Sequence, residues 1–193
     1  MKREYGFTLL ELMVTIVILC ILLGLAIPGF SSWLPNYRLR GATRDIYSNL
    51  QLAKMTAVKD RARCGILFDA GNQKYQVISS GSNRTWESTS GSRAGDDVIL
   101  KEVTFSEYGS GIRYGSGTAT GGVGGSSLEA DSITFADQGI LFDSRGIILG
   151  PSGASSTGGY VYVKNNKDKA YAVGVLPSGV IVMRRWSGTA WQQ

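Results

Sequence analysis

Hydrophobic and polar positions divide this chain into three parts with different periods. The first part is residues 7–27, which are apolar around the whole helical turn and contain a single charged residue, Glu11. A run of about 20 apolar residues has the length of a helix that crosses a membrane. The sequence therefore predicts a membrane-spanning helix over residues 7–27.

The second part, residues 28–63, has the period of an amphipathic helix. Pro28 and Pro35 mark the end of the first segment, because a proline removes a backbone donor and bends or interrupts a helix. Beyond them, apolar residues recur at spacings of three and four, which places them on one face of a resumed helix. The residues expected to pack on a sheet are Leu39, Ala42, Ile46, Leu50, Ala53 and Ala57.

The third part, residues 64–193, consists of short β-prone runs separated by turn residues. Asp69-Ala70-Gly71-Asn72 lies between two such runs and indicates a hairpin, and Pro177-Ser178-Gly179 indicates a tight turn. One long N-terminal helix packed on an antiparallel sheet gives an α+β fold. The expected strands are 65–68, 75–78, 98–103, 132–135, 139–142, 160–164, 170–176 and 180–186.

Two segments of the third part are expected to be long loops. Residues 79–96 are polar and rich in turn formers, and residues 108–127 contain repeated glycines. Glycine-rich loops also bind phosphates, but residues 121–126 lack the lysine and the helix start of a P-loop. We therefore expect no nucleotide site here.

The composition argues against a catalytic or metal site. The chain has no histidine, which removes the usual general base at neutral pH and the histidine ligands of zinc sites. Asp131, Asp137 and Asp143 have the chemistry of acids or metal ligands. Asp143-Ser144-Arg145-Gly146, however, is typical of a turn in which the aspartate bonds the local backbone. We expect no enzyme activity, no metal and no cofactor.

Size, charge and cysteine count fit one anchored domain. A spanning helix leaves enough of the 193 residues for a single compact domain. The formal net charge is +5, and loss of residues 1–6 would leave +4, which suits an anionic partner without requiring one. Cys20 lies in the apolar run and Cys64 in the domain, so we expect no disulfide within the chain.

Glu11 is the residue that an ordinary membrane anchor does not explain. A carboxylate in a spanning helix costs on the order of a few kcal/mol unless it is paired. Cleavage after Gly6 would create an α-amino group on Phe7, about one helical turn from Glu11. That amine has poor geometry for the Glu11 of its own chain, whereas the amine of a neighbouring subunit would pair with it. Such pairing would favour polymerisation and set the register between subunits.

The N-terminal sequence Gly6-Phe7-Thr8-Leu9-Leu10-Glu11, the apolar helix after it and Pro28 resemble the type III signal of type IV pilins and type II secretion pseudopilins. The resemblance implies that residues 1–6 are a leader removed by a prepilin peptidase after Gly6. It also implies N-methylation of Phe7 and packing of helix 7–27 into a filament core, with Glu11 and Pro28 as assembly residues. A plain N-terminal membrane anchor is the alternative.

Later segments are similar to the GspH/FimT group of minor pilins and H-type pseudopilins. The similarity rests on 132–135, on 140–146 with its Arg145-Gly146 turn, and on 171–181. It implies a single-pass inner-membrane protein with its domain in the periplasm, assembled with other pilin subunits by an inner-membrane platform. The implied function is a minor pilin that primes or caps a type IV pilus. The alternative is an H-type pseudopilin acting in protein secretion.

A third function depends on Arg184, Arg185 and Trp186 at the end of the last long strand. Two guanidinium groups beside an aromatic ring have the chemistry to contact phosphates and to stack on a base. Some minor pilins bind DNA for natural transformation through a basic C-terminal segment. Here no further basic residue follows Arg185. The competing interpretation of these residues is a solvated strand end or a contact to a neighbouring subunit.

Overall fold

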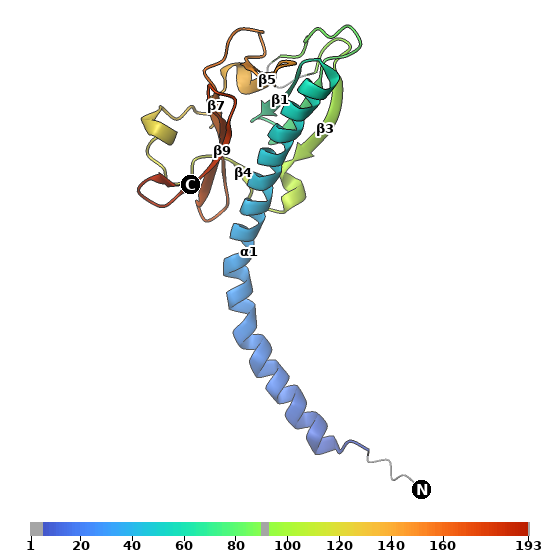
Figure 1. Cartoon of the computed structure of the whole chain (residues 1–193). Coiled ribbons are helices and arrows are strands. Elements are labelled where there is room, and N and C mark those ends of the chain that lie inside the picture. The colour runs from blue at the N-terminus through green and yellow to red at the C-terminus, as the bar shows by residue number, and fades with distance from the viewer. Residues whose placement is uncertain (1–5, 90–92, 193) are drawn as a thin grey trace. The chain divides into compact units, whose positions relative to one another are not determined.

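The computed structural model describes the backbone of residues 6–89 and 93–192, and the side chains of the same residues except 25–32. The chain forms two compact units, Met1–Leu34 and Pro35–Gln193. A single α-helix, α1 (Leu9–Asp60), belongs to both units (Figure 1). Pro28 and Pro35 lie within its bounds, so the expected interruption does not end the helix. A proline lacks one backbone donor, which a long helix tolerates when the bonds on either side persist.

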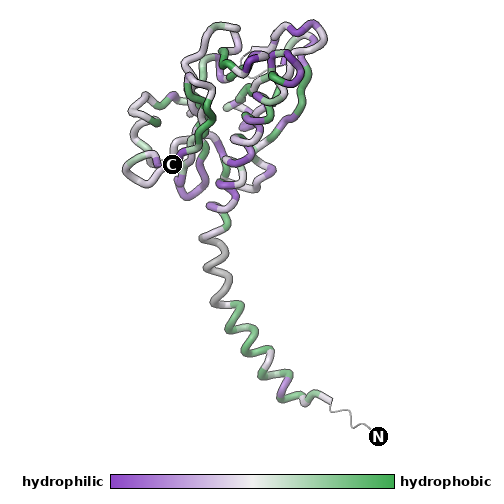
Figure 2. The backbone as a smooth tube through the Cα atoms, in the orientation of Figure 1, coloured by the Kyte–Doolittle hydropathy of each residue, from purple (hydrophilic) through white to green (hydrophobic). Residues whose placement is uncertain are grey.

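The first unit is apolar along its described helical part. Leu9 to Gly24 are all exposed, and the hydropathy colouring of Figure 2 shows this stretch as almost uniformly hydrophobic except near Glu11. Within the residues that the structure describes, no helix has a stretch both long and apolar enough to cross a membrane.

The second unit begins with the amphipathic part of α1, which packs as its period predicts. The six apolar residues expected to face a sheet, from Leu39 to Ala57, are all 0 % exposed. Thr43 and Asn49 are also buried and are satisfied by hydrogen bonds: the hydroxyl of Thr43 donates to the carbonyl of Leu39, and Asn49 Nδ2 donates to the Tyr75 hydroxyl at 2.7 Å. Asn49 therefore fixes the helix to the sheet as well as packing on it.

Among the residues that the structure describes, ten strands form two antiparallel sheets, where the sequence predicted one sheet. The order in the first sheet is β3 (Val98–Thr104), β2 (Lys74–Ser79), β1 (Cys64–Asp69), β5 (Gly139–Phe142) and β6 (Ile148–Leu149). The order in the second is β10 (Trp191–Gln192), β9 (Ile181–Trp186), β8 (Ala170–Val175), β7 (Gly159–Lys164) and β4 (Arg113–Tyr114).

Both predicted turns are confirmed. The register of β1 with β2 pairs Asp69 with Lys74, which closes the expected hairpin. Between β8 and β9, the amide of Gly179 donates to the carbonyl of Leu176 at 2.8 Å, and Gly179 has φ of 75°. Glycine adopts this left-handed conformation without the steric cost of a side chain.

The strand predicted over 132–135 is wrong. Only Ile133 forms a bridge, to Val161 of β7, and Ser132 has φ of 63°. The next residues form a short 3-10 helix, η3 (Ala136–Gln138), in which Asp137 and Gln138 also have positive φ. Repeated left-handed backbone turns the chain out of the extended conformation that its β-prone residues favour. Two more short helices, η1 (Phe105–Tyr108) and η2 (Val123–Gly125), were not predicted.

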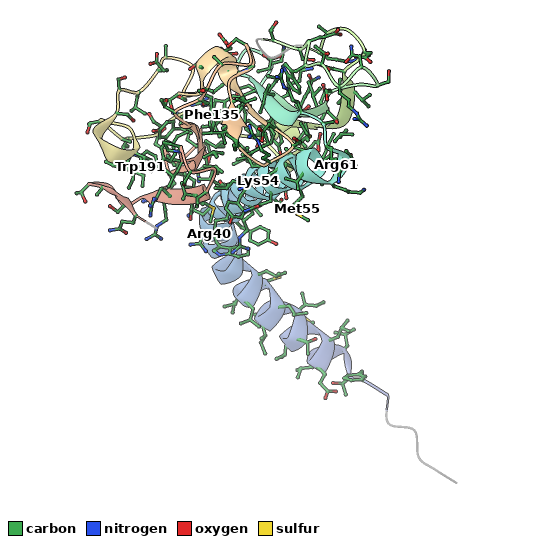
Figure 3. The ribbon with its side chains drawn as sticks, turned by 45° about the horizontal axis from the view of Figure 1, so that its top comes forward. Arg40, Lys54, Met55, Arg61, Phe135 and Trp191 are labelled. Atoms are coloured by element: carbon green, nitrogen blue, oxygen red, sulfur yellow. The ribbon has the colours of Figure 1, made fainter. Side chains whose placement is uncertain are left out.

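The hydrophobic core lies where α1 and both sheets meet. All its buried members lie between Leu39 and Ile181. Phe68 of β1 stacks on Phe135, which Figure 3 labels, with ring centroids 5.5 Å apart. This contact joins the first sheet to the segment whose Ile133 bridges to β7 of the second sheet. The unit Pro35–Gln193 thus contains a complete core of its own, as a domain that folds independently requires.

Candidate functional sites: the N-terminal motif and an arginine cluster

Thr8 and Glu11 form a capping box at the start of α1. The amide of Glu11 donates to Thr8 Oγ1 at 3.2 Å, and Glu11 Oε2 accepts the amide of Thr8 at 3.4 Å. The pattern Thr-x-x-Glu satisfies two backbone donors that a helix N-terminus leaves without partners. Glu11 thus has a second role besides the pairing of its charge that the sequence predicts. The Thr8-Leu9-Leu10-Glu11 spacing was the signal for this second role.

The other residues of the predicted processing motif are partly described. Gly6 and Phe7 are exposed and precede the helix, and the side chain of Phe7 is 84 % exposed. Residues 1–5 and the side chain of Pro28 lie outside the described residues. The cleavage after Gly6, the methylation of Phe7 and the assembly role of Pro28 stay predictions.

Strand β9 separates residues that are adjacent in the sequence. Side chains alternate between the faces of a strand, so Arg185 points to one face and Arg184 with Trp186 to the other. Arg185 is in register with Tyr171 of β8, whose hydroxyl accepts a hydrogen bond from Arg40 Nε of α1 at 3.1 Å. All three residues nevertheless line neighbouring grooves, since Arg184 and Arg185 share one and Arg185 and Trp186 share another. The DNA contact predicted for them stays a prediction.

An arginine cluster forms where α1 approaches β8 and β9. A groove of about 360 Å³ lies there, and Arg40 is labelled on the helix in Figure 3. None of the ion pairs between described side chains includes an arginine of this groove. Guanidinium groups without carboxylate partners attract anions. The groove is lined by Arg40, Arg44, Tyr171, Met183, Arg184 and Arg185, which we call the arginine cluster.

A smaller groove continues the cluster toward the end of β9. It measures about 250 Å³ and adds Lys169 and Trp186 to Arg40, Tyr171 and Arg185. Sequence analysis missed Arg40 and Arg44 because they are more than 120 residues away from β9 along the chain. Only the packing of α1 on the second sheet brings them to Arg185. The basic surface is thus broader than the Arg184-Arg185 pair.

Two of the three carboxylates considered as acids or metal ligands, Asp131 and Asp143, accept hydrogen bonds from the backbone. Asp143 Oδ1 accepts the amides of Arg145 at 2.8 Å and Ile147 at 2.9 Å. Burial alone would raise the pKa of Asp143, but these bonds and the Arg145 side chain together hold that pKa below its ordinary value of 3.8. Asp131 likewise accepts the amide of Ile133 at 3.0 Å. Across the described part of the chain, no three His, Cys, Asp or Glu side chains are grouped to hold a metal ion.

Comparison with known proteins agrees with this architecture. Residues 1–27 match the prokaryotic N-terminal methylation motif, and residues 42–179 match the model of the type II transport protein GspH. The type IV minor pilin FimU of Pseudomonas aeruginosa PAO1 has a similar structure, with 15 % identity, a TM-score of 0.51, and coverage of 82 % of this chain and 95 % of FimU. Comparison with curated proteins finds no match.

The minor pseudopilin EpsH of the Vibrio cholerae type 2 secretion system is a second structural neighbour. It is 12 % identical with a TM-score of 0.45, and the match covers 76 % of this chain and 95 % of EpsH.

A methylation-type N-terminus followed by a long helix and an α+β domain defines the class of minor pilins and pseudopilins, which are structural subunits of filaments. The GspH model covers more than half of the chain, so the chain belongs to the GspH family. Both family matches indicate a membrane-anchored subunit that associates with other subunits of a pilus or pseudopilus.

Proposed function

We propose that this chain is a low-abundance minor pilin that primes or caps a type IV pilus. The observation that carries the proposal is the contrast between a domain with a complete core and a helical segment whose apolar residues are all exposed. Apolar surface of this extent calls for lipid or for neighbouring helices. A subunit that moves from a membrane into a filament meets both environments in turn.

The proposed processing follows from the N-terminal motif. A prepilin peptidase removes residues 1–6, and Phe7 becomes the methylated N-terminus. Residues 7–27 then cross the inner membrane once, with the domain in the periplasm. An inner-membrane assembly platform transfers the subunit into the filament, where lateral contacts between helices replace contacts with lipid. Glu11 pairs with the N-terminal amine of a neighbouring subunit.

Proteomic comparison of a strain lacking this chain with its parent tests the proposal. Sheared surface filaments and culture supernatant are quantified in both strains, and a complemented strain is the control. Loss of major pilin from the sheared fraction with an unchanged supernatant supports a pilus-priming minor pilin. Normal pili with exoproteins missing from the supernatant would instead establish the H-type pseudopilin.

The arginine cluster favours a second candidate function, binding of DNA for natural transformation. Its arginines come from two elements and give the several positive charges that phosphate contacts require. Filter binding of a single-stranded oligonucleotide to the Pro35–Gln193 domain tests this function. Arg44→Gln and Arg185→Gln should each weaken binding and lower its salt dependence, whereas Lys59→Gln, at the exposed end of α1, should not. No binding by the parent domain at low salt would rule it out.

A further inference from the structure

The glycine-rich segment that the sequence predicts as a loop is fastened to the second sheet by aromatic side chains. Trp191 Nε1 donates to the carbonyl of Gly121 at 2.9 Å, and Trp186 Nε1 donates to Thr118 Oγ1 at 3.1 Å. The amide of Val123 donates to the buried hydroxyl of Tyr162 at 3.0 Å. Three contacts, one each from β7, β9 and β10, hold the segment in one place.

Between this segment and the C-terminal hairpin lies a groove that the proposed function does not use. Its volume of about 610 Å³ lies within the range of small-molecule sites. Figure 3 marks its aromatic side at Trp191. The aromatic groove, as we call it, is lined by Thr120, Gly121, Gly122, Val123, Gly124, Gly125, Arg184, Trp186, Thr189, Ala190 and Trp191.

The two indoles form an angled surface at one end of the groove. The rings of Trp186 and Trp191 have centroids 5.3 Å apart at an interplanar angle of 53°, and both side chains are half-buried. Their N–H groups are already bonded to the glycine-rich segment, so the ring faces are what remains for a ligand. An indole face binds the apolar C–H face of another ring by dispersion and electrostatics.

The wall that the glycine-rich segment supplies is mostly backbone, since four of its six lining residues are glycines and the other two are Thr120 and Val123. No atom lies within 4 Å of the position that a Cβ would take at Gly121, Gly124 or Gly125. Glycine allows a ligand to approach peptide groups closely. Gly122 is different, since a Cβ there would lie 2.7 Å from the Tyr162 hydroxyl, so it is needed for the docking of the segment itself. The amides of Gly122, Val123 and Gly125 are already bonded, but a backbone carbonyl has two lone pairs and can accept a further bond. The wall therefore offers carbonyl oxygens to the hydroxyl and amide groups of a ligand.

The charge of the groove distinguishes between two classes of ligand that stack on indoles, nucleic acids and sugars. Among the described residues that line the aromatic groove, Arg184 is the one that carries a charge. A nucleic-acid strand calls for a row of cations along its phosphates, which this groove lacks. A single guanidinium beside aromatic rings and peptide groups fits a glycan with an isolated carboxylate on an attached group, which the guanidinium can bind through two parallel hydrogen bonds.

We propose that the aromatic groove binds an N-acetylated, carboxylate-bearing glycan, the chemistry of peptidoglycan. The indoles stack on N-acetylated sugar rings, the glycine backbone bonds their hydroxyl and acetamido groups, and Arg184 binds a carboxylate of the peptide that is attached to the glycan. The identification of the glycan depends on the proposed periplasmic location, where the peptidoglycan mesh surrounds any filament that grows from the inner membrane.

The test measures binding of the Pro35–Gln193 domain to purified peptidoglycan sacculi by co-sedimentation. A parallel titration with tetra-N-acetylchitotetraose, which has no carboxylate, follows tryptophan fluorescence. Trp186→Leu keeps apolar bulk but removes the indole face, and we expect it to weaken both interactions about tenfold. Arg184→Gln should weaken binding to sacculi and leave the chitotetraose affinity unchanged. Lys59→Gln, which also removes one positive charge but lies at the exposed end of α1 outside the grooves, is the control and should affect neither.

Three results would overturn the proposal: no binding of the parent domain to either glycan, equal binding by parent and Trp186→Leu, or displacement of the domain from sacculi only by an oligothymidylate. The last result would assign the groove to nucleic acid. Circular dichroism of each variant verifies its fold, and Arg184→Gln serves as the decisive variant if Trp186→Leu unfolds. The glycan proposal and the proposed function are tested separately. Trp186→Leu can lose glycan binding while filaments assemble normally, which leaves the proposed function intact, and the deletion strain tests the proposed function alone.

Discussion

Two parts of one helix show how the same secondary structure can depend on different surroundings. The residues Leu9 to Gly24 are apolar around the whole turn and exposed, and their N-terminus is satisfied locally by Thr8 and Glu11. The residues from Leu39 onward have one apolar face, and their own chain covers it with two sheets. A helix that is hydrophobic on all sides needs an environment from outside the molecule. The second part is already covered by its own domain. Substitutions in the first part should therefore affect processing and assembly, and substitutions in the second part should affect the stability of the domain.

The largest effect should come from blocking the separation of the leader. We expect Gly6→Val to abolish cleavage, because the added branched side chain sits directly at the proposed cut. Mass spectrometry of the membrane fraction would show a precursor heavier by residues 1–6, while the domain keeps its stability. Gly24→Val, within the apolar stretch, is the matched control and should be processed. An unchanged mature mass for Gly6→Val would remove the proposed cleavage site.

The next largest effect separates the two roles of Glu11. Glu11→Gln keeps a side chain suited to the capping box but removes the charge, and Thr8→Ala removes the cap hydroxyl but keeps the charge. If charge pairing sets the register, Glu11→Gln should nearly abolish recruitment into sheared filaments, measured against the membrane pool by immunoblotting. Thr8→Ala should then reduce recruitment much less. The reverse order would assign Glu11 to capping.

In the second part of the helix, the readout becomes stability. Leu50→Ala should lower the free energy of unfolding by about 2–5 kcal/mol, because the side chain is 0 % exposed and a cavity would remain. Leu52→Ala, with a 43 % exposed side chain two residues along, should change it by less than about 1 kcal/mol. Both values come from urea unfolding of the Pro35–Gln193 domain. Equal losses would mean that the helix packs differently from the structure described above.

The smallest effect concerns acid. The pKa of Asp143 is lowered in the folded chain, so its hydrogen bonds stabilise the fold above the ordinary pKa of 3.8 and are lost as the pH falls through the lower folded value. Asp143→Asn should therefore lower the thermal midpoint slightly at pH 7 and make it less dependent on pH below about 4. A pH series of unfolding curves would measure this. Identical pH dependence in parent and variant would contradict the assignment.

The sequence predicts those features that depend on neighbours along the chain. The buried face of α1, the hairpin at Asp69 to Asn72 and the turn at Gly179 follow from spacing and turn chemistry. Strands β4, β6 and β10 have two residues each, too few to show alternation. The division into two sheets cannot be predicted from the sequence pattern either. Alternation of apolar and polar residues indicates that a segment is a strand, but it does not indicate which strand pairs with it.

The candidate sites show the same limit. The processing motif is continuous in sequence and was found there, together with Glu11. The arginine cluster depends on a contact between Arg40 and Tyr171, which are 131 residues apart, and no local pattern indicates it. The capping role of Glu11 does follow from the sequence, because Thr8 lies three residues earlier. The prediction based on the charge of Glu11 considers only a partner in another subunit.

Strand β9 imposes a rule on how this surface can change. One strand supplies Arg185 to the arginine cluster and Trp186 to the aromatic groove, and Arg184 lines both. Insertion or deletion of a single residue in β9 would exchange the two sets of side chains between the grooves, since the period of a strand is two. Substitutions can alter either groove by itself, whereas any change in the length of β9 alters both at once. In descendants of this chain, the length of that strand should therefore be preserved even where its residues diverge.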